Sequence, residues 1–558
     1  MTATIKTVTT KVYDGQKPGT SGLRKRVKIF QQPHYTENFV QAILESIPQD
    51  EGGAKGATLV VGGDGRYYLD EVLQVIVKLS AAAGVRRLIV GQNGILSTPA
   101  VSNLIRINKA TGGILLTASH NPGGPDNDFG IKYNMSNGGP APENVTDRIY
   151  EITKTIKEYY VADVPNVDFS QLGTQQVADM TIDIIDSVTD YVDMLKSIFD
   201  FDAIKSFFDT NKNFKMLFDG MNGVTGPYGY RLFVEELGLP ESSVMRFKPL
   251  MDFGGAHPDP NLTYAHDLVE RVEKEGYDFG AASDGDGDRN MIIGKQAFVT
   301  PSDSVAIIAH YARDCIPYFQ KNGVHGLARS MPTSLAIDRV AEKLGLKAYE
   351  VPTGWKFFGN LMDAQCCSIC GEESFGTGSD HIREKDGMWA IVAWLSILAH
   401  VNKEKPTSVQ DVLQRHYQIY GRNFFSRYDY EDVESKGADE MVDRLRKLIE
   451  SQEWVGQTFG GFTVTTMDDF EYRDPIDGSV SKNQGIRIIF KDTSRIVVRL
   501  SGTGSQGATV RLYVEKYSDN PAEYATDTQV ALKPLIQVAL QLSQLEQFTG
   551  RSAPTVIT

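Results

Sequence analysis

The chain has 558 residues, of which 41% are hydrophobic and 23% charged, and its formal net charge is −14. Its length predicts about four domains, and its composition is that of an ordinary globular protein. An acidic chain is a poor candidate for binding nucleic acid or an anionic membrane, so we expect neither as a partner. No stretch approaches the ~20 apolar residues of a membrane span, and the N-terminal residues lack the apolar core of a signal peptide.

The cysteines are Cys315, Cys366, Cys367 and Cys370. Three of them crowd into one segment, which is not the spacing of a disulfide framework, and Cys367 and Cys370 form only half of a zinc or redox motif. We therefore expect buried, reduced thiols in a soluble, intracellular protein.

Strands and helices alternate in the first part of the chain. We expect a strand at 58–61, a helix at 69–83, a strand at 87–90, a helix with Thr98 as N-cap and Pro99 as first residue, and a strand at 114–116. This β-α-β-α-β order predicts a mostly parallel sheet that is covered by helices.

The same order of strands and helices recurs along the chain, although the amino-acid sequence itself does not repeat. We expect strands at 214–218 and 279–282 around a helix near 228–236, then helices at 302–310 and 333–344 and a strand at 368–370. Each cycle closes on a strand that runs into a loop rich in glycine and polar residues. This layout indicates internal duplication.

The last part of the chain has a different pattern. Helices at 440–450 and 521–545 enclose strands at 462–466, 485–490, 495–500 and 509–514, which is typical of an α+β domain, and the polar stretch 402–408 is a candidate hinge before it. We predict three similar α/β domains with mostly parallel, mixed sheets, followed by a C-terminal α+β domain. The predicted domains are 1–190, 191–303, 304–407 and 408–558.

Ser119 lies in the segment TASHNPGG (117–124), directly after a predicted strand. Asn-Pro and Gly-Gly force a turn there, so Ser119 occupies the kind of loop that displays reactive side chains. A serine hydroxyl is a weak nucleophile unless a base, a metal or a charge assists it. An ordinary turn after a strand is the alternative interpretation.

Asp284, Asp286 and Asp288 alternate with glycines in the segment DGDGD. Oxygen-only ligands on a loop that can curl favour a hard cation, Mg²⁺ or Ca²⁺. An EF-hand is excluded because its sixth and twelfth positions would be Arg289 and Lys295. The alternative is a solvated acidic turn, but carboxylates this close repel one another when no cation is bound. Because Mg²⁺ commonly pairs carboxylates with a phosphate oxygen, the pattern also points to a phosphorylated partner.

Three further segments carry groups suited to a sugar phosphate. Segment 371–379 is predicted to be a mobile loop whose carboxylates and hydroxyls suit sugar hydroxyls, with Arg383 and Lys385 beyond it for charge or proton handling. Segment 499–505, together with Arg511, combines guanidinium groups, hydroxyls and glycines as in a clamp for a phosphate that is not transferred. Segment 19–26 is either a phosphate contact or a basic surface loop. A simple turn and an exposed hairpin are the alternatives for the first two. Together with Ser119 and the aspartates, these groups indicate phosphoryl transfer on a phosphorylated sugar.

The chain resembles the α-D-phosphohexomutases, and among them the eukaryotic phosphoglucomutases. The segments that carry the resemblance are PGTSGLRKRV (18–27), TASHNPGG (117–124), DGDGDRN (284–290), VPTGWKFF (351–358), GEESFGTGSDHIREKDG (371–387) and RLSGTGS (499–505). The GEES form is similar to the glucose-selective branch. The resemblance implies four domains in a heart shape around a central cleft, and a cytoplasmic enzyme of glucose metabolism.

The resemblance also implies roles for individual residues. Ser119 would be carried as phosphoserine, and would ligate Mg²⁺ together with Asp284, Asp286 and Asp288. The groups expected at the reacting centre, with proton roles that remain unassigned, are Arg24, His120, Lys132 and Lys385. The groups expected to bind substrate are Arg289 at the transferring phosphoryl group, Thr353, Gly354, Glu372 and Ser374 at the sugar, and Arg499, Ser501, Thr503 and Arg511 at the distant phosphate.

The implied activity is that of a phosphoglucomutase, an isomerase that interconverts glucose 1-phosphate and glucose 6-phosphate. Glucose 1,6-bisphosphate would be both intermediate and activator. We expect small phosphosugars as partners, and a monomer or weak homodimer. The alternatives are a phosphomannomutase or a glucose 1,6-bisphosphate synthase on the same scaffold, and a non-catalytic phosphoglucomutase-like phosphoprotein. A metal-dependent phosphatase is disfavoured by the phosphate clamp.

Overall fold

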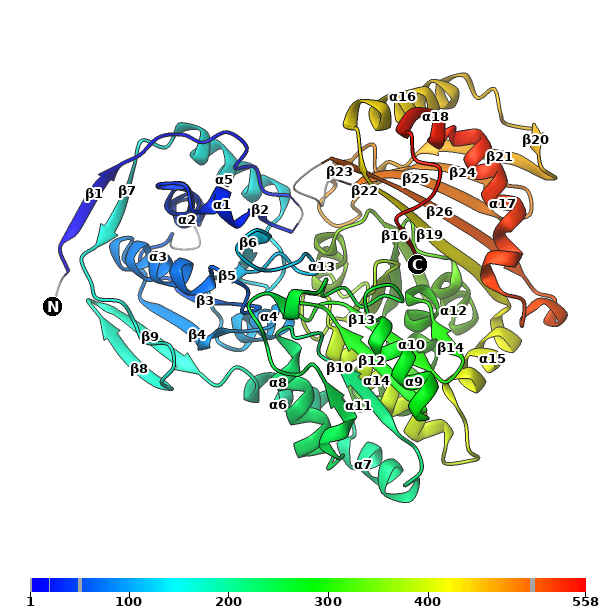
Figure 1. The fold of residues 1–558 in the computed structure, drawn as a ribbon, viewed down its shortest axis with the longest axis horizontal. Helices are drawn as coiled ribbons and strands as arrows, with labels where there is room; N and C mark the ends of the chain where they lie inside the picture. The colour runs from blue at the N-terminus through cyan, green and yellow to red at the C-terminus, as the bar shows by residue number, and fades with distance from the viewer. Residues whose placement is uncertain (1–2, 20, 49–52, 502–506) are drawn as a thin grey trace. The chain divides into compact units, whose positions relative to one another are not determined.

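The computed structural model of the chain describes residues 3–19, 21–48, 53–501 and 507–558 (Figure 1). The chain forms two compact units. Unit 1 consists of Met1–Gln296, Tyr311–Gly323 and Phe375–Pro406. Unit 2 consists of Ala297–His310, Val324–Ser374 and Thr407–Thr558. The last crossing between the units falls inside the stretch 402–408 that was expected as a hinge. The four domain boundaries stay a prediction, because compactness groups more than one sheet into each unit.

The first sheet of unit 1 contains the predicted β-α-β-α-β segment. Its strands, in spatial order, are β2 (Leu23–Arg26), β6 (Asp128–Met135), β5 (Gly112–Leu116), β3 (Thr58–Gly63), β4 (Arg87–Ile95), β9 (Met180–Ile185) and β8 (Gly173–Val177). β3 pairs in parallel with β4 and β5, whereas β6 is antiparallel to both β5 and β2. A separate antiparallel ribbon joins β1 (Ile5–Thr9) to β7 (Glu158–Ala162). The sheet is therefore mixed, with a parallel centre.

Helices cover this sheet, and most of them share one apolar core with it. They are α1 (Val27–Phe30), α2 (Tyr35–Ser46), α3 (Leu69–Ala82), α4 (Thr98–Ile107) and α5 (Glu143–Thr155). The predicted start of α4 was wrong by one residue. Ser97 is the N-cap, and its hydroxyl accepts a hydrogen bond from the Ala100 amide, because the Thr98 hydroxyl is engaged elsewhere: it donates to Asp286 at 2.8 Å.

The order of strands repeats in the next two sheets. In unit 1, β10 (Met216–Asp219) lies between β11 (Val244–Met245) and β12 (Phe279–Ser283), both parallel to it, and β13 (Asn290–Gly294) is antiparallel to β12. In unit 2, β15 (Gly326–Ser330) lies between β16 (Lys347–Val351) and β17 (Ile369–Glu372), both again parallel. In each sheet the first strand of the cycle lies between the second and the third, as β3 does between β4 and β5. The predicted duplication of layout is confirmed.

Further helices belong to these cycles. Those of unit 1 are α6 (Thr189–Ile198), α7 (Phe201–Thr210), α8 (Thr225–Gly229) with the π-helical η2 (Tyr230–Glu236), α9 (His266–Glu275), α11 (Pro317–Asn322) and α14 (Gly387–Val401). Those of unit 2 are α12 (Ala336–Leu344), α13 (Trp355–Asp363) and α15 (Val409–Tyr420). Helix α10 (Pro301–Cys315) has residues in both units.

The C-terminal part of unit 2 is an antiparallel sheet with helices α16 (Ser435–Ser451) and α17 (Thr528–Ser543) packed on it, coloured yellow to red in Figure 1. Its strands, in spatial order, are β20 (Thr458–Phe459), β21 (Phe462–Asp469), β24 (Ile486–Phe490), β25 (Arg495–Ser501), β26 (Ala508–Ser518), β19 (Arg422–Val433) and β27 (Val556–Ile557). The predicted α+β class is confirmed. The expected last helix at 521–545 begins later, at Thr528, because Pro521–Glu523 form a separate 3₁₀ helix, and the short α18 (Leu545–Thr549) follows it.

Three features differ from the sequence prediction. Helix α14 was not predicted because nearly all of its side chains are buried, so it lacks an amphipathic stripe. Strand β19 was missed for a similar reason, since its residues are buried almost without alternation. The predicted loop at 371–379 instead consists of buried strand at both ends, in β17 and in β18 (Gly376–Ser379).

The cysteines all lie within the described residues, and none of them forms a disulfide. Cys367 and Cys370 are buried as expected, whereas Cys315 and Cys366 are partly exposed. Among the described residues, the helices are too short or too polar to cross a bilayer.

His416 on α15 generates a prediction about acid stability. Burial, with a smaller contribution from His310, lowers the pKa of His416 to about 3. The unfolded chain binds this proton near pH 6.5, so the fold loses stability as pH falls from about 6.5 towards 3, by up to about 1.4 kcal/mol per pH unit. We expect His416→Phe to flatten the pH dependence of the unfolding midpoint between pH 7 and 4. The exposed His266→Phe is the control, and equal pH slopes in the native chain and His416→Phe would contradict this account.

Candidate active site

Ser119 lies just past the carboxyl end of β5, in a strained backbone conformation. Its φ of 53° is in the left-handed region, which costs a serine of order 1 kcal/mol unless the surroundings hold it. The side chain is only 2% exposed. The strain and the burial both indicate a hydroxyl that is held in one place for chemistry.

A buried network holds the Ser119 backbone from both sides. The Ser119 amide donates to Thr117 Oγ1 at 2.7 Å, and the Thr117 hydroxyl donates to Asp64 Oδ2 at 2.6 Å. Arg66, itself fully buried, pairs with Asp64 at 2.9 Å and donates to the Ser119 carbonyl at 2.9 Å. Asp64 and Arg66 were not predicted as site residues. The available signal was the segment GDGR at the end of β3, where a charged pair directly follows a buried strand.

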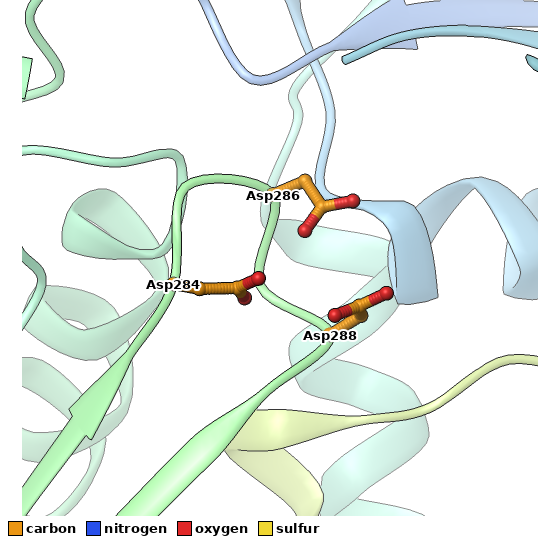
Figure 2. Close-up of side chains that lie close together, drawn as sticks. All are labelled: Asp284, Asp286 and Asp288. Carbon is orange, nitrogen blue, oxygen red and sulfur yellow. The ribbon is translucent and has the colours of Figure 1, made fainter. Parts of the chain in front are cut away.

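The predicted cation loop runs from the end of β12 to the start of β13, and Figure 2 shows its carboxylates on one turn. One oxygen from each of Asp284, Asp286 and Asp288 can be chosen so that all lie within 4.8 Å of one another. The Ser119 hydroxyl donates to Asp284 Oδ2 at 3.1 Å. The structure thus joins two motifs that are 165 residues apart in the sequence.

The electrostatics of this loop favour a bound cation. Burial, and next the charges of Asp286 and Asp288, raise the pKa of Asp284 well above its ordinary value. Among the described residues, Oδ1 of Asp286 and Oδ1 of Asp288 are buried without a hydrogen-bond partner. Thr98 fixes Asp286 by donating its amide to the Asp286 carbonyl at 2.9 Å and its hydroxyl to the carboxylate. Buried carboxylate oxygens without hydrogen-bond partners fit a hard divalent cation.

Positive side chains surround Ser119 and the aspartates. Arg24 on β2 lies opposite Gly130 of β6, so its side chain shares a face with Lys132. Burial lowers the pKa of Arg24, while Asp286 and Asp288 act in the opposite direction. Lys385 Nζ lies 3.0 Å from Asp288 Oδ2.

Two more predicted residues lie in the same region of unit 1. His120 Nδ1 is 3.4 Å from the Ser119 hydroxyl oxygen. Arg289, at the end of the cation loop, donates its amide to Asp284 at 3.0 Å and pairs through Nη1 with Asp259 at 3.1 Å. Unit 1 therefore gathers a hydroxyl, an imidazole, a cluster of carboxylates that could hold a cation, and several positive side chains.

The predicted sugar-binding residues come together in unit 2. The Gly354 amide donates to Glu372 Oε1 at 2.9 Å, which links the start of α13 to the end of β17. Ser374 is buried, and Thr353 Oγ1 is buried without a hydrogen-bond partner among the described residues. Glu373, between two predicted sugar contacts, likewise has both carboxylate oxygens without such a partner. These are the donors and acceptors that a polyhydroxylated ligand would satisfy.

The predicted phosphate clamp lies on one face of the C-terminal sheet. Arg499 on β25 is directly opposite Arg511 on β26, and Ser501 is opposite Thr509. Like charges at opposite positions destabilise a sheet unless an anion neutralises them. Thr503, the fourth residue predicted at this phosphate, lies outside the described residues.

Unpredicted neighbours support both arginines. Arg499 donates to the Tyr513 hydroxyl at 3.1 Å, and Arg511 Nε lies 3.7 Å from Asp429 Oδ1. Burial disfavours the charge of Arg499, but Tyr513, Glu373 and Glu372 raise its pKa overall. Both glutamates influence Arg499, so the end of β17 lies near the predicted phosphate clamp within unit 2. No local sequence pattern identifies Tyr513 or Asp429, because each contributes only through its neighbour on the next strand.

Family models match four consecutive parts of the chain. They are the phosphoglucomutase/phosphomannomutase α/β/α domains I (residues 15–160), II (189–297) and III (300–420), and the phosphoglucomutase-1 C-terminal domain (422–555).

Individual relatives match over the whole length. Phosphoglucomutase of Aspergillus fumigatus is 59% identical, covering 99% of this chain and 100% of the relative. Phosphoglucomutase-1 of Bos taurus is 58% identical at the same coverage. Among solved structures, the open form of the exocytosis-sensitive phosphoprotein parafusin from Paramecium, also named a phosphoglucomutase, is 48% identical with a TM-score of 0.90 and covers 100% of both chains. The chain belongs to the phosphoglucomutase/phosphomannomutase family.

Proposed function

We propose that this chain is a phosphoglucomutase, which interconverts glucose 1-phosphate and glucose 6-phosphate. The observation that carries the proposal is the hydrogen bond from the Ser119 hydroxyl to Asp284, one of three clustered buried carboxylates. A phosphoryl acceptor and a hard-cation site are thereby joined in one place. Relatives named phosphoglucomutase, which are 58–60% identical over the full length, support this choice of substrate.

The proposed reaction uses Ser119 as a phosphoserine. In the first transfer the bond between phosphorus and Ser119 Oγ breaks and a bond from phosphorus to O6 of glucose 1-phosphate forms. The O6 proton passes to a basic group, and Ser119 Oγ takes up a proton. The product is glucose 1,6-bisphosphate. In the second transfer the bond between O1 and phosphorus breaks, and a bond from phosphorus to Ser119 Oγ forms. The Ser119 hydroxyl gives up its proton to a basic group, O1 takes up a proton, and glucose 6-phosphate leaves.

Residues of unit 1 would provide charge and proton handling at the transfer. Asp284, Asp286, Asp288 and an oxygen of phosphoserine 119 would hold Mg²⁺, which when bound neutralises charge that develops on the transferring oxygens. Positive charge that serves the same purpose would come from Arg24, Lys132, Arg289 and Lys385. His120, within reach of Ser119 Oγ, is placed to hold or release a proton.

Residues of unit 2 would select and orient the substrate. Thr353, Gly354, Glu372 and Ser374 would bind sugar hydroxyls, and Arg499, Ser501, Thr503 and Arg511 would bind the phosphate that is not being transferred. The intermediate presents one phosphate and then the other for transfer, so the clamp must accept either. Two arginines on one sheet face would bind a phosphate group whichever carbon of the sugar carries it.

We also propose a cytoplasmic location. Two Arabidopsis thaliana relatives, 57% and 56% identical, are named probable cytoplasmic phosphoglucomutases. A monomer or weak homodimer stays our expectation for the oligomeric state.

Replacing Ser119 by Ala removes the acceptor oxygen, so turnover of glucose 1-phosphate should be abolished. The measurement is a coupled assay for glucose 6-phosphate with Mg²⁺ and a trace of glucose 1,6-bisphosphate, with an unchanged unfolding midpoint as the control for folding. Native-level turnover in Ser119→Ala would refute the mechanism. A native chain that is phosphorylated on Ser119 by intact mass, yet inactive, would instead favour a non-catalytic phosphoprotein.

Mg²⁺ should stabilise the native chain, by about 2.7 kcal/mol at a concentration 100 times its Kd. Asp284→Asn should abolish this stabilisation and raise the metal-free unfolding midpoint, because it removes one of three repelling carboxylates. Thermal unfolding after chelation, with and without added Mg²⁺, makes the comparison. A native midpoint that does not respond to Mg²⁺ would contradict the cation site.

Glucose 1-phosphate should be preferred over mannose 1-phosphate, because the carboxylate of Glu372 is fixed by the Gly354 amide and so accepts hydroxyl donors in one geometry. Competing kcat/KM values measure the preference, and Glu372→Gln should reduce it. A preference for mannose 1-phosphate would refute the glucose assignment and favour a phosphomannomutase.

A further inference from the structure

Glu384 is a fully buried carboxylate that the proposed mechanism does not use. It lies in the segment between β18 and α14 and is 0% exposed. Its Oε1 accepts hydrogen bonds from Lys132 Nζ and, at 2.9 Å, from Asn134 Nδ2. A buried glutamate is costly unless its partners are well placed, so these two contacts define what Glu384 can do.

Both partners come from one strand. Lys132 and Asn134 are two residues apart on β6, so their side chains project from the same face of the sheet. Asn134 also donates to the Gly138 carbonyl at 3.0 Å, which anchors the amide independently of the lysine. The carboxylate is therefore fixed by Asn134 and can in turn fix the ammonium group of Lys132.

The segment that carries Glu384 is itself braced at both ends. His381 lies 2.6 Å from the Ser379 hydroxyl through Nδ1 and 2.9 Å from Asp386 through Nε2, and Tyr191 donates to Asp386. The next residue after Glu384, Lys385, reaches Asp288 of the cation loop. This segment therefore supplies Lys385 near the aspartates, and through Glu384 it also holds Lys132.

We propose that Glu384 is a positioning residue that holds the Lys132 ammonium group in place for phosphoryl transfer. The inference rests on the proposed function, in which Lys132 belongs to the reacting centre. A lysine carries its charge on a flexible four-carbon stem, so its position is set by what its ammonium group binds. Fixing that group before the substrate arrives removes an ordering step from the transfer.

The test is a double-mutant cycle on kcat with Glu384→Gln, Lys132→Met and the double variant. We expect Glu384→Gln to lower kcat about 10- to 100-fold with KM changed less than about threefold, since misplacement of a transition-state group acts on the chemical step. In the Lys132→Met background the same substitution should leave kcat unchanged. Glu384→Asp, which keeps the charge, should recover part of the loss.

A matched control is Glu515→Gln in unit 2. Glu515 is also a buried glutamate that accepts from an asparagine, Asn423 at 2.7 Å, and a buried cation, Arg495 at 2.8 Å. Glu515→Gln should lower the unfolding midpoint with little effect on kcat, as expected for a carboxylate that is only structural.

The proposal would be overturned by a native kcat in Glu384→Gln, or by equal loss of kcat in the native and Lys132→Met backgrounds. If Glu384→Gln is insoluble, Glu384→Asp makes the same comparison in both backgrounds. An inactive native chain would refute the proposed function instead, so the two failures are distinguishable.

Discussion

The mutual repulsion of three buried carboxylates is the constraint around which the candidate active site of unit 1 is built. Asp284, Asp286 and Asp288 are held close together by a turn with glycine at every second position. Several neighbours compensate for it: Arg24 lies in their field, Lys385 pairs with Asp288, and the Ser119 hydroxyl donates to Asp284. The compensation is incomplete without a cation, because Oδ1 of Asp286 and Oδ1 of Asp288 are buried without a hydrogen-bond partner among the described residues.

The duplicated layout explains why the reactive groups lie where they do. In each cycle the third strand ends in a functional loop: β5 leads to Ser119, β12 to Asp284, and β17 to Glu372 and Ser374. In open α/β sheets, ligands bind beyond the carboxyl ends of parallel strands. Three copies of one strand order therefore present three different sets of groups from equivalent positions: a hydroxyl, a carboxylate cluster and the proposed sugar-binding residues. In the antiparallel C-terminal sheet the proposed phosphate clamp arises by another route, through residues that face each other across two strands.

Much of this arrangement could be predicted from the sequence, because loops that follow apolar strands are visible as local patterns. Ser119 and the aspartates were predicted in this way, and the structure brings the Ser119 hydroxyl to Asp284. The two arginines were predicted instead from guanidinium groups beside hydroxyls and glycines, and the structure places them opposite each other on neighbouring strands. Asp64, Arg66 and Glu384 were not predicted, since each acts on a residue far away in the sequence and no spacing rule reports that contact. The N-cap of α4 was misassigned for the same reason: the hydroxyl of Thr98 suits a cap locally, but Asp286 engages it from a distant loop. Buried elements such as α14 were missed because periodicity requires a contrast between two faces, and a wholly buried helix has none.

Gly285 limits how far this part of the chain can vary. A β-carbon at that position would lie 2.5 Å from the Ser119 carbonyl oxygen, which real structures do not tolerate. The carbonyl cannot yield easily, because Arg66 holds it and the backbone there is already in the left-handed region. Even alanine would thus push the cation loop away from the hydroxyl that it meets. The two loops therefore constrain each other at this contact, and the smallest possible substitution there would separate the Ser119 hydroxyl from the carboxylates that it meets.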